Sequence, residues 1–437
     1  MRESLPMIEA PSVSRCALPG TPLSQASAGI DACVHCGFCL QACPTYLALE
    51  DENDSPRGRI VLMRGLLDGT VTPQDPVVQQ HLDRCLGCRA CETACPSGVP
   101  YGHLLEATRA TLRATTAPPL LARLILRIFA SPTLLRLALA GGRVLRALKL
   151  PMVLAALPGR MGSGMAMLAG TRPVIRTRRW RASGDGARGP VTLLRGCVME
   201  GLQQGTNQAT GRVLTVNGYR MVETSAQGCC GALHAHAGDL QTARRMARIN
   251  IAAFEVHPDA LIAVNSAGCG AMLKEYAHLL HDDLEWHRRA QAVSDRTRDA
   301  SELLAAAGPM PASLPSPLRI TYDAPCHLQH AQRITTPPLA VLAAIGNLTH
   351  LPLEDSDQCC GSAGIYNLIE PGVSDAVLAP KLRHIAATGA ELVVTGNPGC
   401  LMQISAGLKR SGSAVRVVHP IDLLDAAYAA SAASVGE

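Results

Sequence analysis

Two short segments of the sequence repeat one spacing of cysteines. In each segment, two residues separate the first three cysteines from one another, and a fourth cysteine follows after three more residues, directly before a proline. These cysteines are Cys33, Cys36, Cys39 and Cys43 in the first segment and Cys85, Cys88, Cys91 and Cys95 in the second. The run C-x2-C-x2-C-x3-C-P is the bacterial pattern for the ligands of two [4Fe–4S] clusters. We therefore expect two [4Fe–4S] clusters in the N-terminal part of the chain.

The same spacing predicts how the eight cysteines divide between the clusters. A tight loop points three thiolates at one face of a cubane, and the fourth cysteine, displaced by a helical turn, serves the neighbouring cluster. The expected ligands are Cys33, Cys36, Cys39 and Cys95 for cluster 1 and Cys43, Cys85, Cys88 and Cys91 for cluster 2. Gly37 and Gly87 let the loop backbone approach the clusters, where its amides can hydrogen-bond the sulfurs. A pair of zinc sites is the alternative, but tetrahedral zinc requires neither the third cysteine step nor the Cys-Pro ending.

A second, longer repeat of cysteines fills the C-terminal part. Its two copies are Cys197, Cys229, Cys230 and Cys269, and Cys326, Cys359, Cys360 and Cys400. The intervening lengths are 31 and 38 residues in the first copy and 32 and 39 in the second. Each copy reads as a strand ending at a cysteine, a helix, a strand ending at Cys-Cys-Gly, a helix, and a third strand ending at a cysteine, which predicts parallel β/α units. Ligands of such sheets lie outside the carboxyl ends of the strands, where these cysteines fall.

Three interpretations of these eight C-terminal cysteines stay open: further electron-carrying clusters, a structural or regulatory metal such as zinc, and free or redox-active thiols. Four histidines lie beside them in the sequence: His234, His236, His327 and His330. Each alone is more often a hydrogen-bonded polar side chain than a ligand, but together they would suit quinone or proton-coupled chemistry. Cys16 belongs to no motif and is expected to be a bystander. Neither a G-x-G-x-x-G fingerprint nor a catalytic triad is present, so we predict no catalytic residue and no flavin site.

The net charge of +5 is concentrated in one stretch. Residues 104–190 hold fifteen Lys and Arg against two acids, Glu106 and Asp185, so this stretch is +13 and the remainder is −8. Its basic and apolar residues mix at roughly helical intervals, which is typical of contact with an anionic membrane surface or with acidic partner subunits. Aromatic residues are only 3% of the chain, so nucleic acid is not an expected partner. The N-terminus lacks an apolar signal segment, and no apolar window of about 18 residues is free of charge. We expect a cytoplasmic protein with reduced thiols, peripheral on the inner face of the cell membrane.

In layout the chain resembles the iron–sulfur subunits of glycolate oxidase over essentially its whole length. The two cysteine segments, the two C…CCG…C copies and the phrases SPRGRI, LRGCV, CCGALHAH, DAPCHLQH, CCGSAGIYN and NPGC carry the similarity. Iron–sulfur subunits of lactate-utilisation, anaerobic glycerol-3-phosphate dehydrogenase and heterodisulfide reductase systems share this layout. The resemblance implies a non-flavin subunit of an oxidoreductase complex, itself not catalytic toward glycolate. Flavin-containing partner subunits would oxidise glycolate to glyoxylate, and this chain would pass the electrons toward a quinone.

Three alternatives to this function stay open. One is the same electron-transfer role in a lactate or glycerol-3-phosphate dehydrogenase, the second is a CCG-type thiol/disulfide reductase, and the third is a non-enzymatic assembly or redox-sensing module. In the fuller motif of heterodisulfide reductase the last element is CxxC. Ser266 and Asn397 stand here three residues before Cys269 and Cys400, in place of the first cysteine. The absence of these two thiolates counts against the reductase.

The expected fold class is α+β multidomain, with an α-helical ferredoxin-like two-cluster domain followed by two repeated α/β CCG domains. The expected boundaries are 1–103 for the ferredoxin-type domain, 104–190 for a basic apolar helical connector, 191–280 for the first CCG domain, 281–316 for a helical connector and 317–437 for the second CCG domain. Between the two cysteine segments, Ser55-Pro56-Arg57-Gly58-Arg59 predicts a turn followed by a helix. A solvated helix start is favoured there over a role for Arg57 or Arg59 in offsetting cluster charge.

Overall fold

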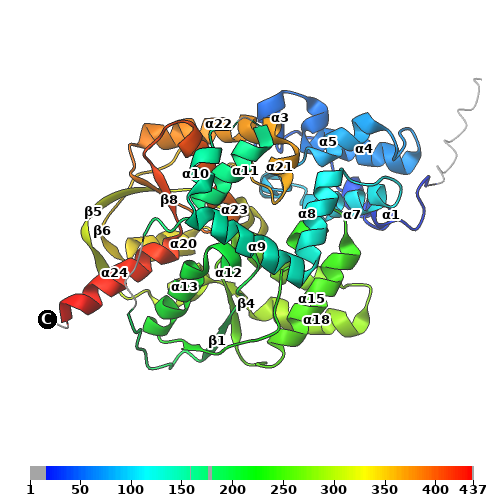
Figure 1. Cartoon of the computed structure of the whole chain (residues 1–437). Helices are drawn as coiled ribbons and strands as arrows, with labels where there is room; N and C mark the ends of the chain where they lie inside the picture. Colours follow the sequence, from blue (N-terminus) through cyan, green and yellow to red (C-terminus); the bar gives the residue numbers. More distant parts are fainter. Residues whose placement is uncertain (1–15, 158, 176–179, 436–437) are drawn as a thin grey trace, which may run out of the picture.

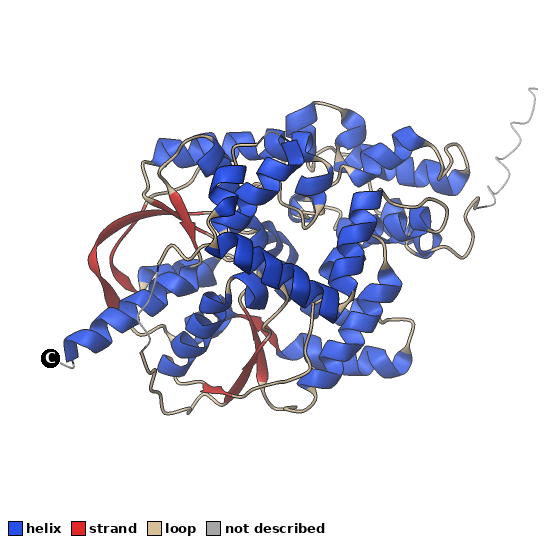
Figure 2. Cartoon of the chain, viewed as in Figure 1, coloured by secondary structure: helices blue, strands red, loops and turns tan. Residues whose placement is uncertain are grey.

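The computed structural model describes residues 16–435 apart from residues 158 and 176–179. Helices make up most of the chain, and the strands form two separate sheets in the C-terminal half, drawn in red in Figure 2. The two N-terminal cysteine segments lie in a purely helical region, at the blue end of the colour scale in Figure 1. A helical region followed by two sheets agrees with the predicted α+β arrangement.

Short helices build the N-terminal region. They are α1 (Pro22–Gln25), α2 (Ser27–Asp31), α3 (Pro44–Leu49), the 3-10 turn η1 (Glu52–Asp54), α4 (Pro56–Asp68), α5 (Pro76–Asp83), α6 (Ala90–Ala94) and α7 (Tyr101–Arg113). The side chains of Ser55 and Asp75 cap the first amides of α4 and α5, and a proline opens each of these helices. Leu23, Met63 and Leu82 are completely buried between them, so one apolar core fixes both cysteine segments.

Four helices of the basic middle segment lie across the front of the molecule in Figure 1. They are α8 (Leu120–Ala130), α9 (Pro132–Ala147), α10 (Leu150–Leu154) and α11 (Gly159–Gly170). No residue of α9 is buried, and α8 buries only Ala122 and Leu126. Among the residues that the structure describes, no single helix has the length and apolarity to span a bilayer. Among these residues, only the pair α8 and α9, taken together, has the length and apolarity of a span, and the two helices are bent by 104° relative to each other.

Each C-terminal repeat forms a sheet of four parallel strands. The first sheet contains β1 (Pro190–Leu193), β2 (Arg220–Met221), β3 (Leu261–Val264) and β4 (Thr297–Asp299) in the order β2-β1-β3-β4. The second contains β5 (Ala312–Tyr322), β6 (Ile345–His350), β7 (Leu392–Val394) and β8 (Arg416–Val418) in the order β6-β5-β7-β8. Val191 is paired with Met221 on one side and Leu261 on the other, and Ile320 occupies the matching position in the second sheet. The predicted parallel β/α units are therefore present twice, in the same order.

The helices of the two repeats pack around a shared core. They are α12 (Val198–Leu202), α13 (Gln204–Val216), α14 (Ala232–His236), α15 (Leu240–Phe254), α16 (Ala267–Lys274), α17 (Tyr276–Leu279), α18 (Leu284–Arg296) and α19 (Ala300–Ala307) in the first repeat, and the π-helical turn η2 (His327–Ala331), α20 (Thr336–Ala343), α21 (Tyr366–Ile369), α22 (Pro371–Thr388), α23 (Pro398–Arg410) and α24 (Pro420–Val435) in the second. Buried apolar residues of both sheets, including Val191 and Ile320, belong to one cluster with residues of α24. Arg212 of α13 donates to both carboxylate oxygens of Asp425 in α24, at 2.8 and 2.7 Å. The two repeats are thus held as one body.

Three details differ from the sequence-based expectation. Strand β2 ends at Met221 and β6 at His350, so the Cys-Cys pairs lie on loops and not at strand ends. Each sheet has a fourth strand that was not expected, and β4 and the start of β5 lie in the 281–316 segment, beside the helices α18 and α19. β4 has only the three residues Thr-Arg-Asp, which is too short a segment to show an apolar alternation in the sequence. It is a strand because it pairs with β3, and this pairing cannot be read from the sequence.

Candidate metal centres

The two N-terminal cysteine loops share one backbone conformation. The residues before and after the second cysteine have positive φ in both loops: His35 (53°) and Gly37 (86°) in the first, Gly87 (62°) and Arg89 (63°) in the second. Left-handed residues at such positions turn backbone amides toward the inside of a loop, where they can hold an anion. The amide of Gly87 donates to Cys85 Sγ at 3.4 Å. The loops therefore offer amide donors as well as thiolates, which suits an anionic iron–sulfur cluster.

The first predicted ligand set surrounds a small cavity near the surface. Cys33, Cys36, Cys39 and Cys95 line this cavity together with Cys91. Cys36 is exposed, and the other three members of the set are half-buried. Burial raises the pKa of Cys39 to about 11. A free thiol is protonated there at neutral pH, whereas bound metal would hold it as the thiolate.

The second predicted ligand set is buried. Its members Cys43, Cys85, Cys88 and Cys91 are all less than one-tenth exposed. Burial raises the pKa of Cys91 well above its usual range, and the neighbouring Cys88, Cys85 and Cys43 add to the rise because nearby thiolates repel one another. The structure thus brings each of the two predicted sets together, side by side, and the crowded thiols fit the ligand shell of a cluster.

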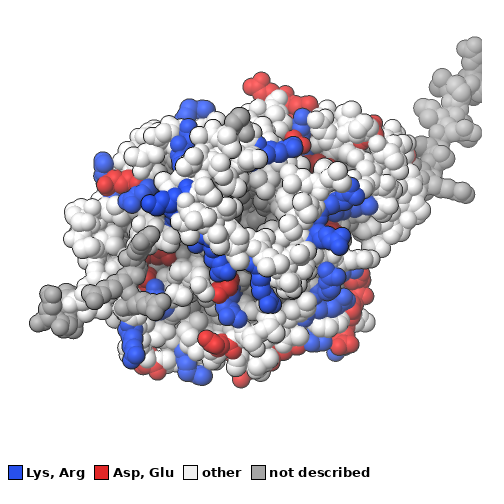
Figure 3. Space-filling view, in the orientation of Figure 1, with Lys and Arg blue, Asp and Glu red and all other residues white. Residues whose placement is uncertain are grey.

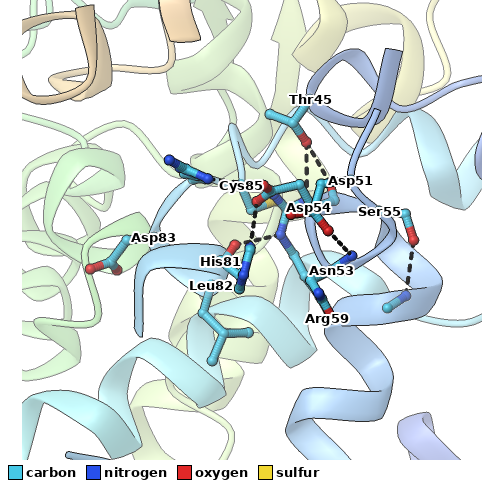
Figure 4. A network of polar contacts seen from close by, with 12 residues as sticks. Thr45, Asp51, Asn53, Asp54, Ser55, Arg59, His81, Leu82, Asp83 and Cys85 are labelled. Atoms are coloured by element: carbon cyan, nitrogen blue, oxygen red, sulfur yellow. Dashed lines mark hydrogen bonds and ion pairs between the residues drawn. The ribbon is translucent and has the colours of Figure 1, made fainter. Parts of the chain in front are cut away.

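Arg59 lies in a buried polar network beside the second set, drawn in Figure 4. Its guanidinium donates to Asp54 Oδ1 at 3.0 Å, to Thr45 Oγ1 at 3.1 Å and to the carbonyl oxygen of His81 at 2.7 Å. The side chain is completely buried. Burial lowers the pKa of Arg59, but the charges of Cys85 and other acidic neighbours outweigh this effect and raise it overall. Arg59 is therefore a permanent cation next to the cysteines.

The prediction of a solvated helix start is wrong for Arg59 and correct in part for Arg57. Helix α4 packs close to η1: a Cβ on Gly58 would lie 1.9 Å from the carbonyl oxygen of Glu52. This close approach turns Arg59 inward. Arg57 keeps 31% of its side chain exposed, pairs with Glu52 at 2.8 Å and donates to the carbonyl oxygen of His35 at 3.3 Å. The periodicity of a short helix start could not distinguish these two arginines.

Each C-terminal set forms a row of contacting thiols beyond the carboxyl ends of its sheet. The rows run Cys197–Cys229–Cys230–Cys269 and Cys326–Cys359–Cys360–Cys400, and within each row every thiol is close enough to its neighbour to shift that neighbour's pKa. Four thiols at one place are a donor set that fits a metal ion or a cluster. Cys16 is exposed and belongs to neither row.

Comparisons with known proteins identify the family. Residues 29–99 match the family described as 4Fe-4S dicluster domain, and residues 191–274 and 320–405 match the family described as cysteine-rich domain. The chain is 38% identical over 412 residues to the probable glycolate oxidase iron-sulfur subunit of Bacillus subtilis (strain 168), covering 90% of this chain and 92% of that protein. It is 35% identical to the glycolate oxidase iron-sulfur subunit of Escherichia coli (strain K12), covering 92% and 95%. The chain belongs to the glycolate oxidase iron–sulfur subunit family.

The family assignment confirms the predicted resemblance and supports an iron–sulfur electron-transfer subunit of an oxidoreductase. A more distant relative is lactate utilization protein A of Shouchella clausii (strain KSM-K16), 29% identical over 237 residues, which are 54% of this chain and 98% of that protein. The 4Fe-4S and cysteine-rich domains agree with the predicted iron–sulfur clusters.

Ser266 and Asn397, which stand where the fuller CxxC motif has its first cysteine, contact each other. Ser266 and Asn397 lie at the ends of β3 and β7, with Oγ and Oδ1 3.5 Å apart. Asn397 Nδ2 donates to Cys400 Sγ at 3.5 Å, and the neighbouring Cys230 and, less strongly, Ser266 lower the pKa of Cys269. Asn397 thus acts as a hydrogen-bond donor to the remaining thiol of its repeat, and Ser266 donates to Asn397.

The second row of thiols touches the second N-terminal set, which sequence spacing could not reveal. Cys88 and Cys359 belong to one buried cluster, and the neighbouring Cys359 lowers the pKa of Cys88. His327 and His330 reinforce the contact: His327 Nε2 lies 3.1 Å from the carbonyl oxygen of Gly87, and His330 Nδ1 lies 2.9 Å from Thr93 Oγ1. The end of the second repeat is therefore docked on the second cysteine loop.

The first repeat docks on α7 and, through the ion pair between Glu275 and Arg89, also on the second cysteine loop. His236 Nδ1 lies 2.8 Å from Glu106 Oε1, and Arg109 donates to the carbonyl oxygen of His236 at 2.9 Å. His234 is completely buried, with Nε2 3.1 Å from the carbonyl oxygen of Leu126 in α8. All four predicted histidines are therefore held by hydrogen bonds, and His236 of the first repeat meets His327 of the second, with their ring centroids 5.3 Å apart.

A buried ion pair distinguishes the second repeat from the first. Lys381 Nζ donates to Asp323 Oδ1 at 2.6 Å, and both side chains are 2% exposed. Burial lowers the pKa of Lys381, but Asp323 outweighs this effect and raises it overall, so the lysine is charged. Asp323 lies three residues before Cys326, and Lys381 lies 21 residues after Cys360. The same offsets in the first repeat give Leu194 and Ile251, both buried in an apolar cluster.

Proposed function

We propose that this chain is the electron-transfer subunit of a glycolate-oxidising complex, which receives electrons from flavin-containing partner subunits and passes them toward a membrane quinone. Clusters bound at the cysteine sets would supply one-electron carriage. The observation that supports this proposal best is the contact between Cys88 and Cys359. It makes the cysteine sets continuous from the exposed Cys36 to the buried second repeat.

The ligand sets proposed for the clusters follow the predicted spacing. Cluster 1 takes Cys33, Cys36, Cys39 and Cys95, and cluster 2 takes Cys43, Cys85, Cys88 and Cys91. The thiol rows of the two repeats are proposed sites for further clusters or zinc.

The exposed first set is the proposed entry point for electrons. Val34 and Phe38 flank Cys36 and are each 67% exposed. Exposed apolar side chains beside a redox site are typical of a docking surface, and the small cavity of the first set opens there. We place the flavin-containing partner on this surface.

The chain's own charges would stabilise added electrons. Arg59 lies next to the second set, and Lys381 lies near Cys360 and Cys400. Both cations are buried, where charge interactions are screened less than at the surface. Each would therefore favour the reduced, more negative form of its neighbouring site.

The proposal is tested by Cys36→Ser in the assembled complex, with Cys16→Ser as the matched control at an exposed cysteine outside every set. We expect Cys36→Ser to abolish glycolate-dependent quinone reduction while the flavin content of the partners persists. Cys16→Ser should leave both unchanged. Undiminished quinone reduction in Cys36→Ser would refute the electron-transfer role, and faster turnover of lactate or glycerol 3-phosphate than of glycolate would favour the alternative complexes.

The face formed by α8–α11 is the proposed membrane-contacting surface. Exposed large apolar side chains gather there, among them Leu120 (76%), Leu137 (65%) and Val153 (72%). Lys and Arg side chains scatter over this face in Figure 3. Of the arginines, Arg123, Arg127, Arg136 and Arg143 are exposed and form no ion pair among the described residues. Apolar side chains mixed with unpaired cations suit an anionic lipid surface.

Vesicle sedimentation tests this surface. The variant Leu120→Asp/Leu137→Asp should lose binding to vesicles containing anionic lipid, whereas Leu284→Asp, at an equally exposed leucine on α18, should bind like the unmodified protein. Equal binding by both variants would refute membrane contact and favour contact with an acidic partner subunit.

A further inference from the structure

A cavity of about 410 Å³ lies where the second cysteine loop, α7, the start of α8 and both repeats meet. Its apolar lining includes Leu86, Ala122 and Leu233. Cys85 of the second cysteine set also lines it. The volume lies within the range of small-molecule sites in proteins.

The cavity opens on the proposed membrane-contacting face. Residues of α8 and α21 line it, and Figure 3 shows a hollow near the centre of this face, between the positions that α8, α9 and α21 occupy in Figure 1. An apolar molecule leaving the lipid phase would meet this opening beside α8. The cavity is therefore connected both to the proposed lipid surface and to the second cysteine set.

One polar group in the cavity lacks a partner in the protein. Tyr366 lines the cavity and is only 7% exposed, yet its hydroxyl makes no hydrogen bond to any described residue. Burial raises the pKa of Tyr366 above its usual range, so the phenol stays protonated and can donate. A buried donor without an acceptor costs free energy, and a ligand oxygen would satisfy it.

A second polar group in the cavity can carry a proton. His236 lines the cavity, and Glu106 holds its Nδ1 at 2.8 Å, so Nε2 is left for a ligand. The other groups facing His236 are Arg109, which donates to its carbonyl oxygen, and the ring of His327 at 5.3 Å. A carboxylate behind an imidazole stabilises the imidazolium, which donates through both nitrogens.

A row of imidazoles leads from the surface toward Glu106. The ring of the exposed His281 stacks on that of His278, with 5.6 Å between the ring centroids. The ring of His278 stacks in turn on that of His103, with 3.6 Å between the centroids. His103 lies one helical turn before Glu106 on α7, 3.6 Å from Glu275, which also pairs with Arg89. Burial lowers the pKa of His103, but Glu275 outweighs this effect and raises it overall. The His236 side chain is itself 36% exposed, so protons can reach the Glu106–His236 pair directly from solvent.

The charges of the lining favour a neutral ligand. Arg109 and Arg113 are balanced by Asp83 and Glu370, and Arg109 is already engaged by the carbonyl oxygens of Leu82, Asp83 and Cys85. The charged side chains of the lining thus cancel in number, which gives a small anionic substrate no net positive charge to bind. A flat, neutral molecule with carbonyl oxygens would find apolar walls and two donors.

We propose that this cavity binds the headgroup of the membrane quinone, with Tyr366 and His236 donating hydrogen bonds to its carbonyl oxygens and His236 delivering protons. The inference rests on the proposed function, which supplies the electrons. Reduction takes up two electrons, released by glycolate at the flavin partner, and two protons from solvent by way of Glu106 and His236. Both quinone C=O groups become C–OH, and the quinol returns to the lipid.

Binding is tested directly on the holoprotein with decylubiquinone, and an azido derivative is photolabelled to locate the site by mass spectrometry. We expect labelling of peptides that line the cavity and about tenfold weaker binding in Tyr366→Phe, the effect of one hydrogen bond. Tyr428→Phe is the matched control, because Tyr428 is equally buried but its hydroxyl is bonded to Asn217. Ala122→Phe should block the cavity. Labelling elsewhere, or binding unchanged in both Tyr366→Phe and Ala122→Phe, would overturn the site.

Glu106 acts through His236 as a positioning residue, so its test uses quinone reduction as a function of pH. We expect Glu106→Gln to slow quinone reduction and to change its pH profile, and Glu106→Asp to restore the rate in part. An unchanged pH profile in Glu106→Gln would overturn the protonation path. Glycolate-dependent dye reduction by the unmodified complex is measured in parallel: its absence would refute the proposed function but would not affect the binding result.

Discussion

The ion pair between Lys381 and Asp323 allows a test in which the chain supplies its own control. Lys381 Nζ donates to Asp323 Oδ1 at 2.6 Å and to the carbonyl oxygens of Ser356 and Asp355 at 3.1 and 3.3 Å. Asp323 Oδ2 accepts one more bond, from Thr395 at 2.9 Å. At the matching positions of the first repeat, the apolar Leu194 and Ile251 are packed with no polar partner to lose.

Removal of one partner should be far more harmful than removal of both. In Lys381→Met, Asp323 keeps its charge with only Thr395 as partner, and two carbonyl oxygens lose their donor. Breaking a pair this deeply buried costs about 3–5 kcal/mol. The double variant Asp323→Leu/Lys381→Ile copies the first repeat and leaves no buried charge, so its stability should lie within about 1–2 kcal/mol of the unmodified chain. Each kcal/mol of lost unfolding free energy lowers the melting temperature by roughly 2–4 °C in a folded unit the size of the two repeats together.

Anaerobic calorimetry of the holoprotein measures the difference. We expect Lys381→Met to melt roughly 10 °C below the unmodified protein and the double variant to recover most of that loss. Iron content should follow the same order, because Cys360 and Cys400 lie next to the pair. A single variant that melts within about 2 °C of the unmodified protein would refute the reasoning. So would a double variant as unstable as the single one.

Two further predictions follow from backbone packing and from charge. Gly58→Ala places a Cβ 1.9 Å from the carbonyl oxygen of Glu52, so we expect about 3 kcal/mol of lost stability, whereas Gly372→Ala, in open space, should cost little in the same melting assay. The pKa of Glu275 is lowered from 4.5 to about 2, because His103 and Arg89 outweigh the effect of burial. Its stabilising contribution is therefore complete above pH 4.5 and is lost as the pH falls toward 2. Glu275→Gln should flatten the acid limb of a stability-against-pH curve, and an unaltered limb would contradict this assignment.

The sequence predicted the features that depend on spacing along the chain. Two-residue steps between cysteines force the thiols into one loop, and the structure brings the two predicted sets together. The doubled C…CCG…C pattern likewise predicted two parallel β/α units, because strand-helix alternation is a local property. Strands β4 and β8 were missed because each has three residues, too few for a periodic signal.

Contacts between segments that are distant in the sequence could not be predicted from spacing or periodicity. Arg57 and Arg59 have the same chemistry two residues apart, and only the packing of α4 against η1 decides that one is half-exposed and the other completely buried. The cavity beside Cys85 has lining residues from Gln79 to Glu370, and the unpaired hydroxyl of Tyr366 becomes meaningful only when those residues meet.

The two repeats show why equal spacing does not mean equal roles. Their cysteines follow nearly the same intervals and their strands have the same order. Among the described residues, however, only the second thiol row packs against the N-terminal cysteine sets, through Cys359 and Cys88. The buried Lys381 lies in that same repeat, and the first repeat has an isoleucine in its place. A buried cation is costly unless a negative partner compensates it, and added electrons at the second row would increase that compensation. Under the proposed function, charge and contact therefore both favour the second repeat over the first as the next site for electrons from the N-terminal region.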